Sequence, residues 1–484
     1  MIRPAVPPDL TAGERYGLDV LLDLSRLLVV SDPAIDVVQL TVGAAKPPTP
    51  VSLDHFVQHD VIPERAEGEV RVGRDVLACI TALAGAGAEQ GIRTTDRHGR
   101  VPSAENPLVR AGRERVPVVQ RYAAALRVAV RAVASRRPVR RLAPWPDGRR
   151  WAAAITHDLD IVAGWPVFTV LRVAELVRSR EVARAGRVVG AAAQAIGRNP
   201  VLAGVRALLE AERAAGLPAT WFVLCGTPTP ATWWQGDLTY SPESHSTRCL
   251  LDEITRAGHE IGLHGSFRTM LDADRLREER ARLGRLVGGA PAGVRQHFLR
   301  MRPGRTQAAM QAAGFRYDAT WGFPDRNGLR LGVADSVPAW FVDATAKLEA
   351  VPLVWMDRAL SKYRGVEDPN EWIADALSLA ATCRDVEGLW VGLWHPNLIA
   401  ALGYPGAPDA LRRLLVSLAG EAPYWGTLGQ IVDWRRARRA VRAKRLAGDG
   451  TVELVIAGAY DWSMSVEDEQ GRVVATGVRP QRDG

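Results

Sequence analysis

Apolar runs alternate with helical segments between residues 151 and about 435. A short apolar run bounded by polar residues predicts a buried strand, and apolar residues three and four apart predict an amphipathic helix. The strand candidates are residues 151–156, 219–226, 259–265, 293–298, 348–355 and 388–395. Two helices between them, 201–216 and 246–258, end in glycine, a common helix stop. This alternation predicts an α/β fold with a parallel sheet, either open or closed into a barrel.

The residues before this core have a different pattern. Helical periodicity over 13–30, 73–85 and 121–135 surrounds a loop-rich centre, which predicts a separate mixed α/β domain over 1–135. Residues 136–150 are rich in proline and arginine and predict a linker.

Beyond the core, which we place at 151–435, residues 436–484 predict a basic helix followed by a small β appendage. The helix spans 433–448, and the alternating pattern from 449 onward favours two or three short strands. An arginine-rich helical insert at 166–197 is compatible with contact to an anionic membrane surface. For both basic helices we favour the interpretation of a solvated helix face.

Composition narrows the class of protein. The chain has 484 residues, 47% hydrophobic and 24% charged, typical of a soluble globular protein. Its net charge of +8 comes almost entirely from arginine, with few lysines, which indicates codon bias rather than nucleic-acid binding. Aromatic residues are sparse and are not interleaved with basic stretches, as a base-stacking platform would need. We therefore expect no nucleic-acid partner.

The four cysteines are far apart and form no CxxC pair, which argues against a zinc ribbon or a disulfide framework. The N-terminus lacks the basic-then-apolar pattern of a signal peptide, and no uncharged apolar run is long enough to cross a bilayer. We therefore expect a cytoplasmic protein without a transmembrane segment.

The first candidate for chemistry is the end of the strand at 151–156. An apolar run there gives way to Thr156, His157, Asp158 and Asp160. Side chains of an extended chain alternate, so Thr156 and both aspartates should face one way and His157 the other. Two carboxylates on one face suit a cation, although a pair of loop-capping aspartates would give the same pattern. Parallel α/β folds collect their active residues at such strand ends.

Four further segments place polar residues in similar positions. A histidine such as His264, which ends an apolar stretch beside a glycine, suits a metal ligand, whereas His259 alone is more typical of a helix end or a core. The remaining candidates are Arg295 and His297 in 293–300, Asp318 and Trp321 in 316–323, and His395 in 391–397.

These segments, in this order, resemble the motifs of the polysaccharide deacetylase (NodB-homology) family, carbohydrate esterase family 4. The resemblance covers roughly residues 150–435. The matching positions are 156–160 for the first motif, 258–266 for the second, Arg295 for the arginine that opens the third, 318–321 for the fourth and 393–395 for the fifth; 216–224 resembles the family's second strand.

The resemblance implies a distorted (β/α) barrel and a metal-dependent removal of N-acetyl groups from glycans. It implies zinc as the first choice of cation, with cobalt, nickel and iron as alternatives. The implied roles are Asp158 as general base, Asp160 and His264 as metal ligands, Arg295 orienting Asp158, His395 as general acid tethered by Asp318, Trp321 as a pocket wall and Thr156 as a substrate-binding residue.

The sequence departs from the family at position 268, where the second motif usually has another histidine and this chain has Arg268. A site with two protein ligands would hold zinc poorly, since catalytic zinc sites usually have three. Our candidate for the third ligand is His297, two residues beyond Arg295 on the same face of its predicted strand. His157, His245, a water molecule or the absence of a metal remain alternatives.

The leading hypothesis is a metal-dependent N-deacetylase acting on an acetylamino sugar of a glycan, an oligosaccharide or a lipid-linked precursor. The alternative is a catalytically degenerate glycan-binding protein, which the Arg268 departure favours. A third interpretation, an inverting glycosidase, needs carboxyl groups about 6.5–9.5 Å apart and leaves Arg295 and the histidines without a role. The expected partner is an acetylated glycan, with peripheral membrane contact as a further option.

Overall fold

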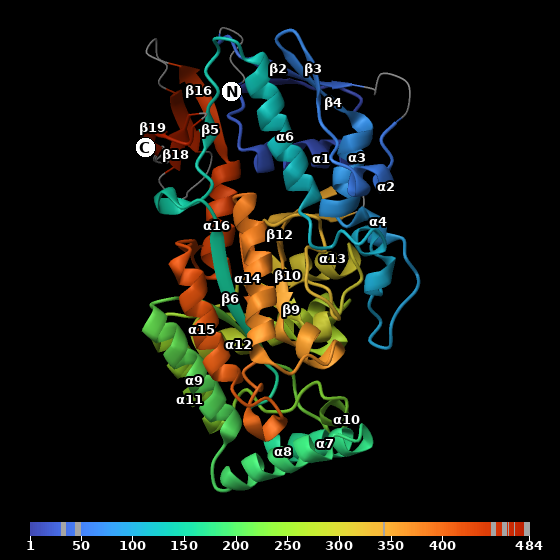
Figure 1. Cartoon of the computed structure of the whole chain (residues 1–484), viewed down its shortest axis with the longest axis vertical. Helices are drawn as coiled ribbons and strands as arrows, with labels where there is room; N and C mark the ends of the chain where they lie inside the picture. Colours follow the sequence, from blue (N-terminus) through green and yellow to red (C-terminus); the bar gives the residue numbers. More distant parts are fainter. Residues whose placement is uncertain are drawn as a thin grey trace.

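The computed structural model describes residues 1–30, 35–43, 50–341, 344–446, 452–456, 462, 464–468 and 470–478. The rest of the predicted appendage lies outside the described residues. The molecule is elongated, with the N-terminal region and the C-terminal strands at one end and helices α7 (Trp165–Arg178) and α8 (Val182–Gln194) at the other (Figure 1).

One large, curled sheet forms the centre of the molecule. Its strand order is β11-β12-β10-β9-β8-β7-β6-β14-β13, and β15 pairs with β6. The strands are β6 (Ala152–Leu159), β7 (Ala219–Leu224), β8 (Glu260–Gly265), β9 (Gly293–Gln296), β10 (Tyr317–Trp321), β11 (Val337–Phe341), β12 (Ala344–Pro352), β13 (Trp355–Met356), β14 (Leu389–Leu393) and β15 (Tyr424–Trp425). The pairings from β12 through β10 and β6 to β13 are all parallel, whereas β11 is antiparallel to β12.

The chain between β12 and β13 connects the two ends of the run of parallel strands in this sheet. Strand β12 pairs with β10, while β13, which follows almost at once, pairs with β14. The amide of Leu353 donates to the carbonyl of Trp321 (3.1 Å), and the next amide, Val354, donates to the carbonyl of Val391 (3.0 Å). The sheet therefore curls into a distorted barrel, and the predicted (β/α) barrel is confirmed.

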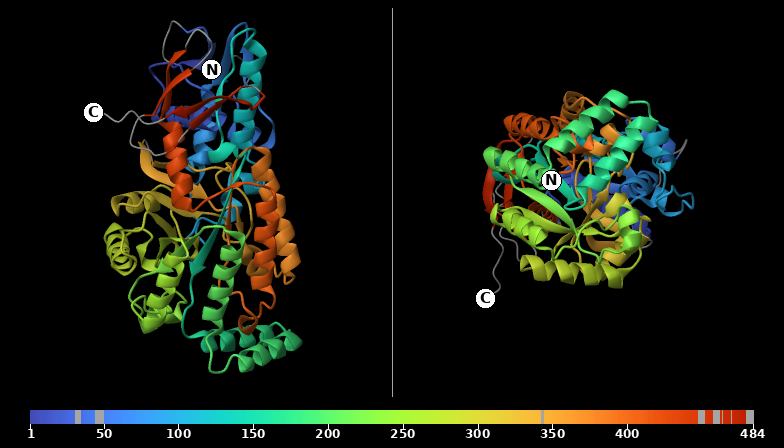
Figure 2. Two further views of the ribbon diagram at one scale, coloured as in Figure 1. Left: turned by 90° about the vertical axis from the view of Figure 1, so that its left-hand side faces the viewer. Right: turned by 90° about the horizontal axis from the view of Figure 1, so that it is seen from below.

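Helices surround the barrel (Figure 2). They are α9 (Pro200–Ala215), α11 (His245–Arg256), α12 (Ala273–Val287), α13 (Arg305–Ala312), α14 (Pro369–Asp385), α15 (Ala407–Gly420) and α16 (Leu428–Arg439). Helix α9 is capped by the side chain of Asn199 and is followed by Gly216, which has φ of +67°. Because helices cover the sheet, all of β6 is buried, which explains its continuous apolar run.

The N-terminal region contains a sheet of order β1-β2-β4-β3. Its elements are β1 (Ile2–Ala5), α1 (Ala12–Ser25), β2 (Val38–Gly43), α2 (Leu53–Gln58), β3 (Glu64–Ala66), β4 (Glu69–Gly73), α3 (Arg74–Ala84), α4 (Gly87–Gln90), α5 (Pro107–Arg110) and α6 (Val118–Val133). The helix predicted over 13–30 stops at Ser25, because Arg26 adopts φ of +57° and the next residues are extended. The region packs onto the barrel: the Tyr16 hydroxyl donates to the Pro338 carbonyl (2.8 Å). The domain boundary at 135 stays a prediction.

The basic segment 433–448 differs from its prediction. It is not one solvated helix: α16 ends at Arg439, and β16 (Val441–Leu446) follows and pairs with β17 (Val452–Ile456). Arg435 is fully buried and forms ion pairs of 2.7 Å with Asp23 and with Asp335. The partners come from segments distant in sequence, so the pattern of α16 alone could not reveal the burial.

The predicted linker also takes part in a sheet. Strand β5 (Arg141–Leu142) pairs with β18 (Met464–Glu467), which pairs with β19 (Val473–Val478). The insert at 166–197 is a pair of helices, α7 and α8, separated by Arg180 with φ of +63°. Among the described residues, no helix has both the length and the apolar character needed to span a bilayer.

Candidate metal centre and active site

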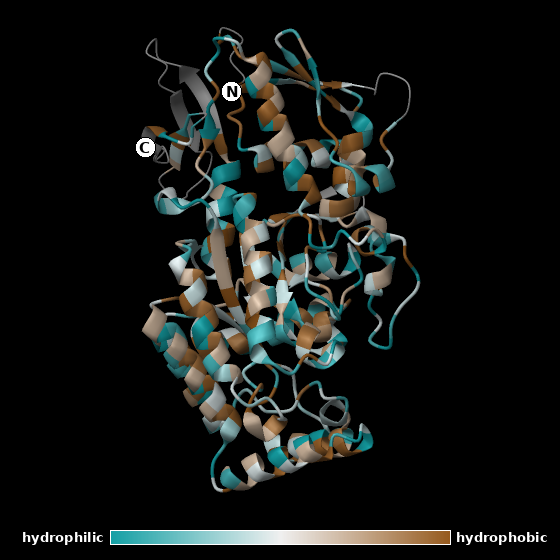
Figure 3. Ribbon diagram, in the orientation of Figure 1, coloured by the Kyte–Doolittle hydropathy of each residue, from teal (hydrophilic) through white to brown (hydrophobic). Residues whose placement is uncertain are grey.

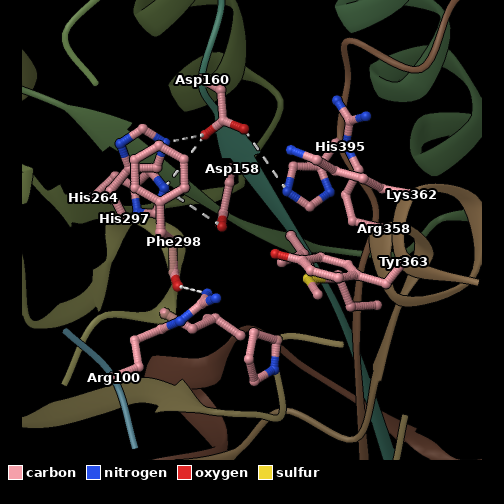
Figure 4. Close-up of a pocket in the computed structure, with 14 residues that line it drawn as sticks. Arg100, Asp158, Asp160, His264, His297, Phe298, Arg358, Lys362, Tyr363 and His395 are labelled. Atoms are coloured by element: carbon pink, nitrogen blue, oxygen red, sulfur yellow. Dashed lines mark hydrogen bonds and ion pairs between the residues drawn. The ribbon is translucent and has the colours of Figure 1, made fainter. Parts of the chain in front are cut away.

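Five of the nine predicted site residues line one pocket at the carboxyl ends of the barrel strands (Figure 4): Asp158, Asp160, His264, His297 and His395. The pocket is built by segments from both the core and the N-terminal region. Its lining residues are Arg100, Asp158, Asp160, His264, His297, Phe298, Leu299, Pro324, Met356, Arg358, Lys362, Tyr363, Leu393 and His395.

Strand β6 sends alternate side chains to opposite faces, as predicted. His157 points away from the pocket, where its Nδ1 donates to the carbonyl of Trp394 (2.7 Å) and its Nε2 contacts Glu212. Asp158 and Asp160 lie on the other side, within 3.6 Å and 3.4 Å of Nε2 of His264. His157 is therefore too well satisfied elsewhere to serve as the third ligand.

Arg295, on β9, positions Asp158. Its Nη1 donates to Oδ1 of Asp158 (2.7 Å) and to Oγ1 of Thr156 (2.9 Å), and its Nε donates to the carbonyl of Ala319 (3.0 Å). Burial raises the pKa of Asp158, but the guanidinium of Arg295 and the nearby imidazoles outweigh it and hold the pKa below its ordinary value. Asp158 is thus a buried carboxylate that stays ionised near neutral pH.

Three donor atoms converge beside Asp158. Asp160, His264 and His297 each present one ligand atom, and these atoms lie within 4.8 Å of one another. Oδ1 of Asp160 is 3.4 Å from Nε2 of His264 and 3.6 Å from Nε2 of His297. Tetrahedral bonds of about 2.0–2.1 Å to a zinc ion give ligand separations of about 3.3 Å. The spacing therefore suits one small cation.

The protonation of both histidines also suits a cation. Nδ1 of His264 lies 2.9 Å from the carbonyl of Arg295, which can only accept, so Nδ1 carries the proton. Nδ1 of His297 donates to Oδ1 of Asp237 (2.8 Å), and Asp237 also accepts the amide proton of Phe267 (3.0 Å). In the neutral form of each ring, the lone pair of Nε2 faces Asp160, the arrangement of histidine ligands backed by a carbonyl or carboxylate.

One oxygen of Asp160 supports the same conclusion. Oδ1 is buried and has no hydrogen-bond partner among the described residues. A buried carboxylate oxygen without a partner is costly, since its desolvation is not compensated. A cation held by this oxygen and the two Nε2 atoms would compensate it, so the residues present fit a divalent metal.

His297 reaches the cluster by a different route from the one predicted. Strand β9 ends at Gln296, and His297 begins a tight turn in which Phe298 and Leu299 have φ of +59° and +51°. Strand alternation therefore does not place it, although the residue lies where the prediction needed a third ligand. Two consecutive non-glycine residues with positive φ are rarely tolerated and are typical of functional sites.

His395 lies on the opposite side of Asp160 from the other two donors, His264 and His297 (Figure 4). Its Nε2 is 3.8 Å from Oδ2 of Asp160, and its Nδ1 donates to Oδ1 of Asp357 (2.6 Å). The other oxygen of Asp357 accepts the backbone amide of His395 (2.6 Å). Burial lowers the pKa of His395, but the carboxylate of Asp357 outweighs it and raises the pKa above its usual value. The imidazole is therefore suited to carry a proton in the pocket.

The prediction that Asp318 tethers His395 is wrong. Asp318 is buried on β10, where it accepts hydrogen bonds from Nε2 of Gln307 (2.8 Å) and from the amide of Thr320 (2.8 Å). Asp357 takes the tethering position because β13 pairs directly with β14.

Two further predictions also differ from the structure. Trp321 is part of the buried apolar core and Thr156 is fully buried, where its hydroxyl donates to the carbonyl of Gly392 (2.8 Å). Neither lines the pocket. The side chain of Thr156 instead helps to hold Arg295.

Four polar residues of the pocket were not anticipated from the sequence. Arg358 and Lys362 follow Asp357, and burial together with Arg358 lowers the pKa of Lys362. Arg100 comes from the N-terminal region and donates to the carbonyl of Phe298. Tyr363 completes the rim. No local pattern marks these residues, because the packing of distant segments brings them to the pocket.

The other histidines and Arg268 lie outside the cluster. Nδ1 of His259 accepts the amide proton of Ala219 (3.0 Å), in keeping with a core histidine. His245 begins α11 and contacts Cys249. Arg268 lines a neighbouring surface cleft.

No protein-family model matches the chain, and no functionally curated protein matches it in sequence. Among solved structures, a protein from Mycobacterium smegmatis assigned to the polysaccharide deacetylases aligns at 24% identity and a TM-score of 0.42, over 63% of this chain and 95% of that one.

Two other solved structures align over a similar share of this chain. The allantoinase PuuE aligns at 17% identity and a TM-score of 0.37, over 60% of this chain and 91% of its own. A family 4 carbohydrate esterase pseudoenzyme from Bacillus anthracis aligns at 9% identity and a TM-score of 0.32, over 60% of this chain and 66% of its own. The structures that align with this chain include polysaccharide deacetylases and carbohydrate esterases of family 4, the family that its five sequence motifs resemble.

Proposed function

We propose that this protein is a metal-dependent hydrolase that removes N-acetyl groups from acetylamino sugars of a glycan or glycan precursor. One observation carries the proposal: the buried Oδ1 of Asp160, which accepts no hydrogen bond among the described residues, lies 3.4 Å and 3.6 Å from the Nε2 atoms of His264 and His297. These three residues would hold the cation, and zinc is the metal that the mixed oxygen and nitrogen donor set favours.

Amide hydrolysis needs a polarised carbonyl, an activated water and a proton for the departing amine. When bound, a divalent cation supplies polarisation of the carbonyl and lowers the pKa of water. Asp158 accepts the proton of the attacking water, since Arg295 keeps it ionised and fixes one oxygen while the other faces His264.

His395 donates the proton to the leaving nitrogen. It lies on the other side of Asp160 from His264 and His297, with its Nε2 3.8 Å from Oδ2 of Asp160. Asp357 holds the ring with Nε2 facing the pocket and favours the protonated form.

The two other interpretations have less support. The presence of Arg268 in place of a histidine favours a degenerate glycan-binding protein. However, His297 supplies the third donor atom, so the site does not need a ligand from position 268. An inverting glycosidase would leave His264, His297 and Arg295 without a role. Neither is carried by an observation of its own.

The proposal is tested by incubating the zinc-loaded protein with acetylated amino-sugar oligosaccharides of several linkages. We expect released acetate and free amines, with no new reducing ends. New reducing ends without acetate would show a glycosidase and overturn the proposal. Binding of oligosaccharides without turnover by a metal-loaded protein would favour the glycan-binding alternative.

Replacing Asp357 with Asn tests the assignment of the acid. Because Asp357 raises the pKa of His395, its loss should lower that pKa, so the protonated ring disappears at a lower pH. We expect kcat to fall by about 10²-fold, the low end of what a positioned acid contributes. The alkaline limb of the kcat profile should move to lower pH, with KM little changed.

Asp318→Asn is the matched control, since the family resemblance implied that residue for the same role. Its carboxylate contacts Gln307 and Thr320 rather than His395. We therefore expect the pH profile of this variant to match the wild type. A shifted limb in Asp318→Asn but not in Asp357→Asn would contradict the assignment.

A further inference from the structure

The helix pair α7–α8 exposes an unusual amount of apolar surface. Sixteen large apolar side chains are exposed within the described residues, and seven of them lie between residues 167 and 196. These seven are Val167, Val170, Leu171, Val177, Val182, Val189 and Ile196. Contiguous exposed apolar patches on monomeric proteins commonly mark interaction sites. Figure 3 shows the hydrophobic segments along both helices at this end of the molecule.

The exposed residues form helical stripes rather than scattered points. On α7, Val167, Val170 and Leu171 have the i, i+3, i+4 spacing of one helix face, and their side chains are 43%, 65% and 53% exposed. On α8, Val182 and Val189 are seven residues apart, as are Val189 and Ile196 just beyond it, so they too share a face. Each helix therefore presents an apolar stripe to the outside.

The inward faces of the two helices do not account for this pattern. They bury a small cluster of their own, Leu176, Ala185 and Val188, and pack Trp165, Phe168 and Ala192 against the main core, which leaves the seven exposed side chains outside. An ordinary surface helix has its apolar residues on the buried face and polar residues outside. Here much of the apolar surface faces outward, and what covers it must be external to the described fold.

Cations accompany the apolar stripes. The acidic residues of the pair are already neutralised, since Glu175 pairs with Arg172 (2.6 Å) and Glu181 with Arg184 (3.0 Å). Four exposed arginines have no carboxylate within ion-pair distance among the described residues: Arg178, Arg180, Arg187 and Arg198. The surface is thus apolar and positively charged, which complements an apolar layer bordered by anions.

The same surface adjoins the catalytic end of the barrel. Helix α7 begins shortly after Asp160, and Trp233 packs on Phe168 of α7, with ring centroids 5.7 Å apart. The neighbouring Trp234 is 83% exposed. Arg172 of α7 and Arg358 of the pocket lie over the same ring of Tyr404, each 5.4 Å from its centroid. One aromatic ring therefore separates the helix pair from the pocket wall.

We propose that α7 and α8 lie in the headgroup layer of an anionic lipid bilayer and hold the catalytic end of the barrel toward the membrane. An exposed apolar face, flanking arginines and a nearby exposed tryptophan are typical of helices that lie in the membrane interface. At 14 residues, α7 is about 21 Å long, which is too short to cross a hydrocarbon core of about 30 Å. A second copy of the chain is a poorer occupant, because a two-fold contact would bring the same arginines together.

Vesicle flotation of the full-length protein tests the proposal. We expect binding to vesicles of phosphatidylcholine with 30% phosphatidylglycerol, and little binding to pure phosphatidylcholine or at high salt. Val170→Glu should abolish flotation, since it places a charge in the stripe. The matched control is Val128→Glu, at 66% exposure against 65% for Val170, on α6 at the other end of the molecule; it should bind like the wild type.

A second variant tests the contribution of the arginines without changing the apolar stripe. Arg187→Gln should weaken binding about fivefold, the effect of one cation near an anionic surface, whereas Arg285→Gln on α12 should leave it unchanged. Failure of the wild type to float with anionic vesicles would overturn the proposal. So would a concentration-dependent dimer in solution that Val170→Glu dissociates, which would identify a second copy as the occupant. Flotation is measured without substrate, so it does not depend on the proposed deacetylation.

Discussion

Asp158→Asn is expected to lower kcat for amide hydrolysis by about 10³-fold, within the range that a positioned general base contributes. The asparagine has the same shape, and its carbonyl oxygen can still accept the hydrogen bond that Arg295 donates at 2.7 Å. It cannot take a proton from water. Because the substitution leaves Asp160, His264 and His297 in place, the variant should still bind a divalent cation, and KM should change little.

The metal content of the variant decides between two roles for Asp158. Its Oδ2 is 3.6 Å from Nε2 of His264, close enough that a ligand role has to be tested. Elemental analysis beside acetate release separates the two, with His264→Ala as the comparison. His264→Ala should lose both metal and activity, because it removes a donor atom. Equal loss of metal in the two variants would contradict the assignment of Asp158 as the base.

The positions of these residues could be predicted because each interrupts an apolar run. Asp158, His264 and His395 stand at or just beyond the ends of β6, β8 and β14, which are parallel strands of one sheet. Their carboxyl ends meet at one edge of a parallel sheet, so local pattern and fold class together suffice. Most strand candidates were correct to within a few residues for the same reason.

The supporting residues could not be predicted in this way. Asp357 and Asp237 are single acids in segments without distinctive pattern, and their roles depend on which histidine lies opposite. The same holds for Arg435, whose burial depends on Asp23 and Asp335. Such long-range pairs are set by the packing of whole elements. Asp318 is an example of a wrong partner inferred from a motif: its carboxylate accepts hydrogen bonds from Gln307 and Thr320 and does not contact His395.

His297→Ala is expected to weaken zinc binding by more than about 100-fold, which is more than the loss of an outer-shell partner costs. It removes one of the three donors and leaves Asp160 and His264, and two protein ligands hold zinc poorly. Elemental analysis of the purified protein, followed by competition with a chelator of known affinity, measures the change. His245→Ala is the control, because that residue lies on α11 outside the cluster.

A variant of the residue that holds His297 shows whether the loss of zinc comes from lost coordination. Asp237→Asn keeps His297 but weakens the hydrogen bond that fixes its Nδ1 proton, so zinc affinity should fall by about 10- to 100-fold, between wild type and His297→Ala. This order of zinc affinities, wild type above Asp237→Asn above His297→Ala, is expected only if Nε2 of His297 binds the metal. If His297 had only a structural role, both variants would be less stable, but their folded molecules would bind zinc as tightly as the wild type. If His297→Ala kept its zinc and His245→Ala lost it, His245 and not His297 would be the third ligand. A wild-type protein that takes up no zinc at all would refute the hydrolytic mechanism and restore the glycan-binding alternative, because Asp160, His264 and His297 would then have no cation to hold.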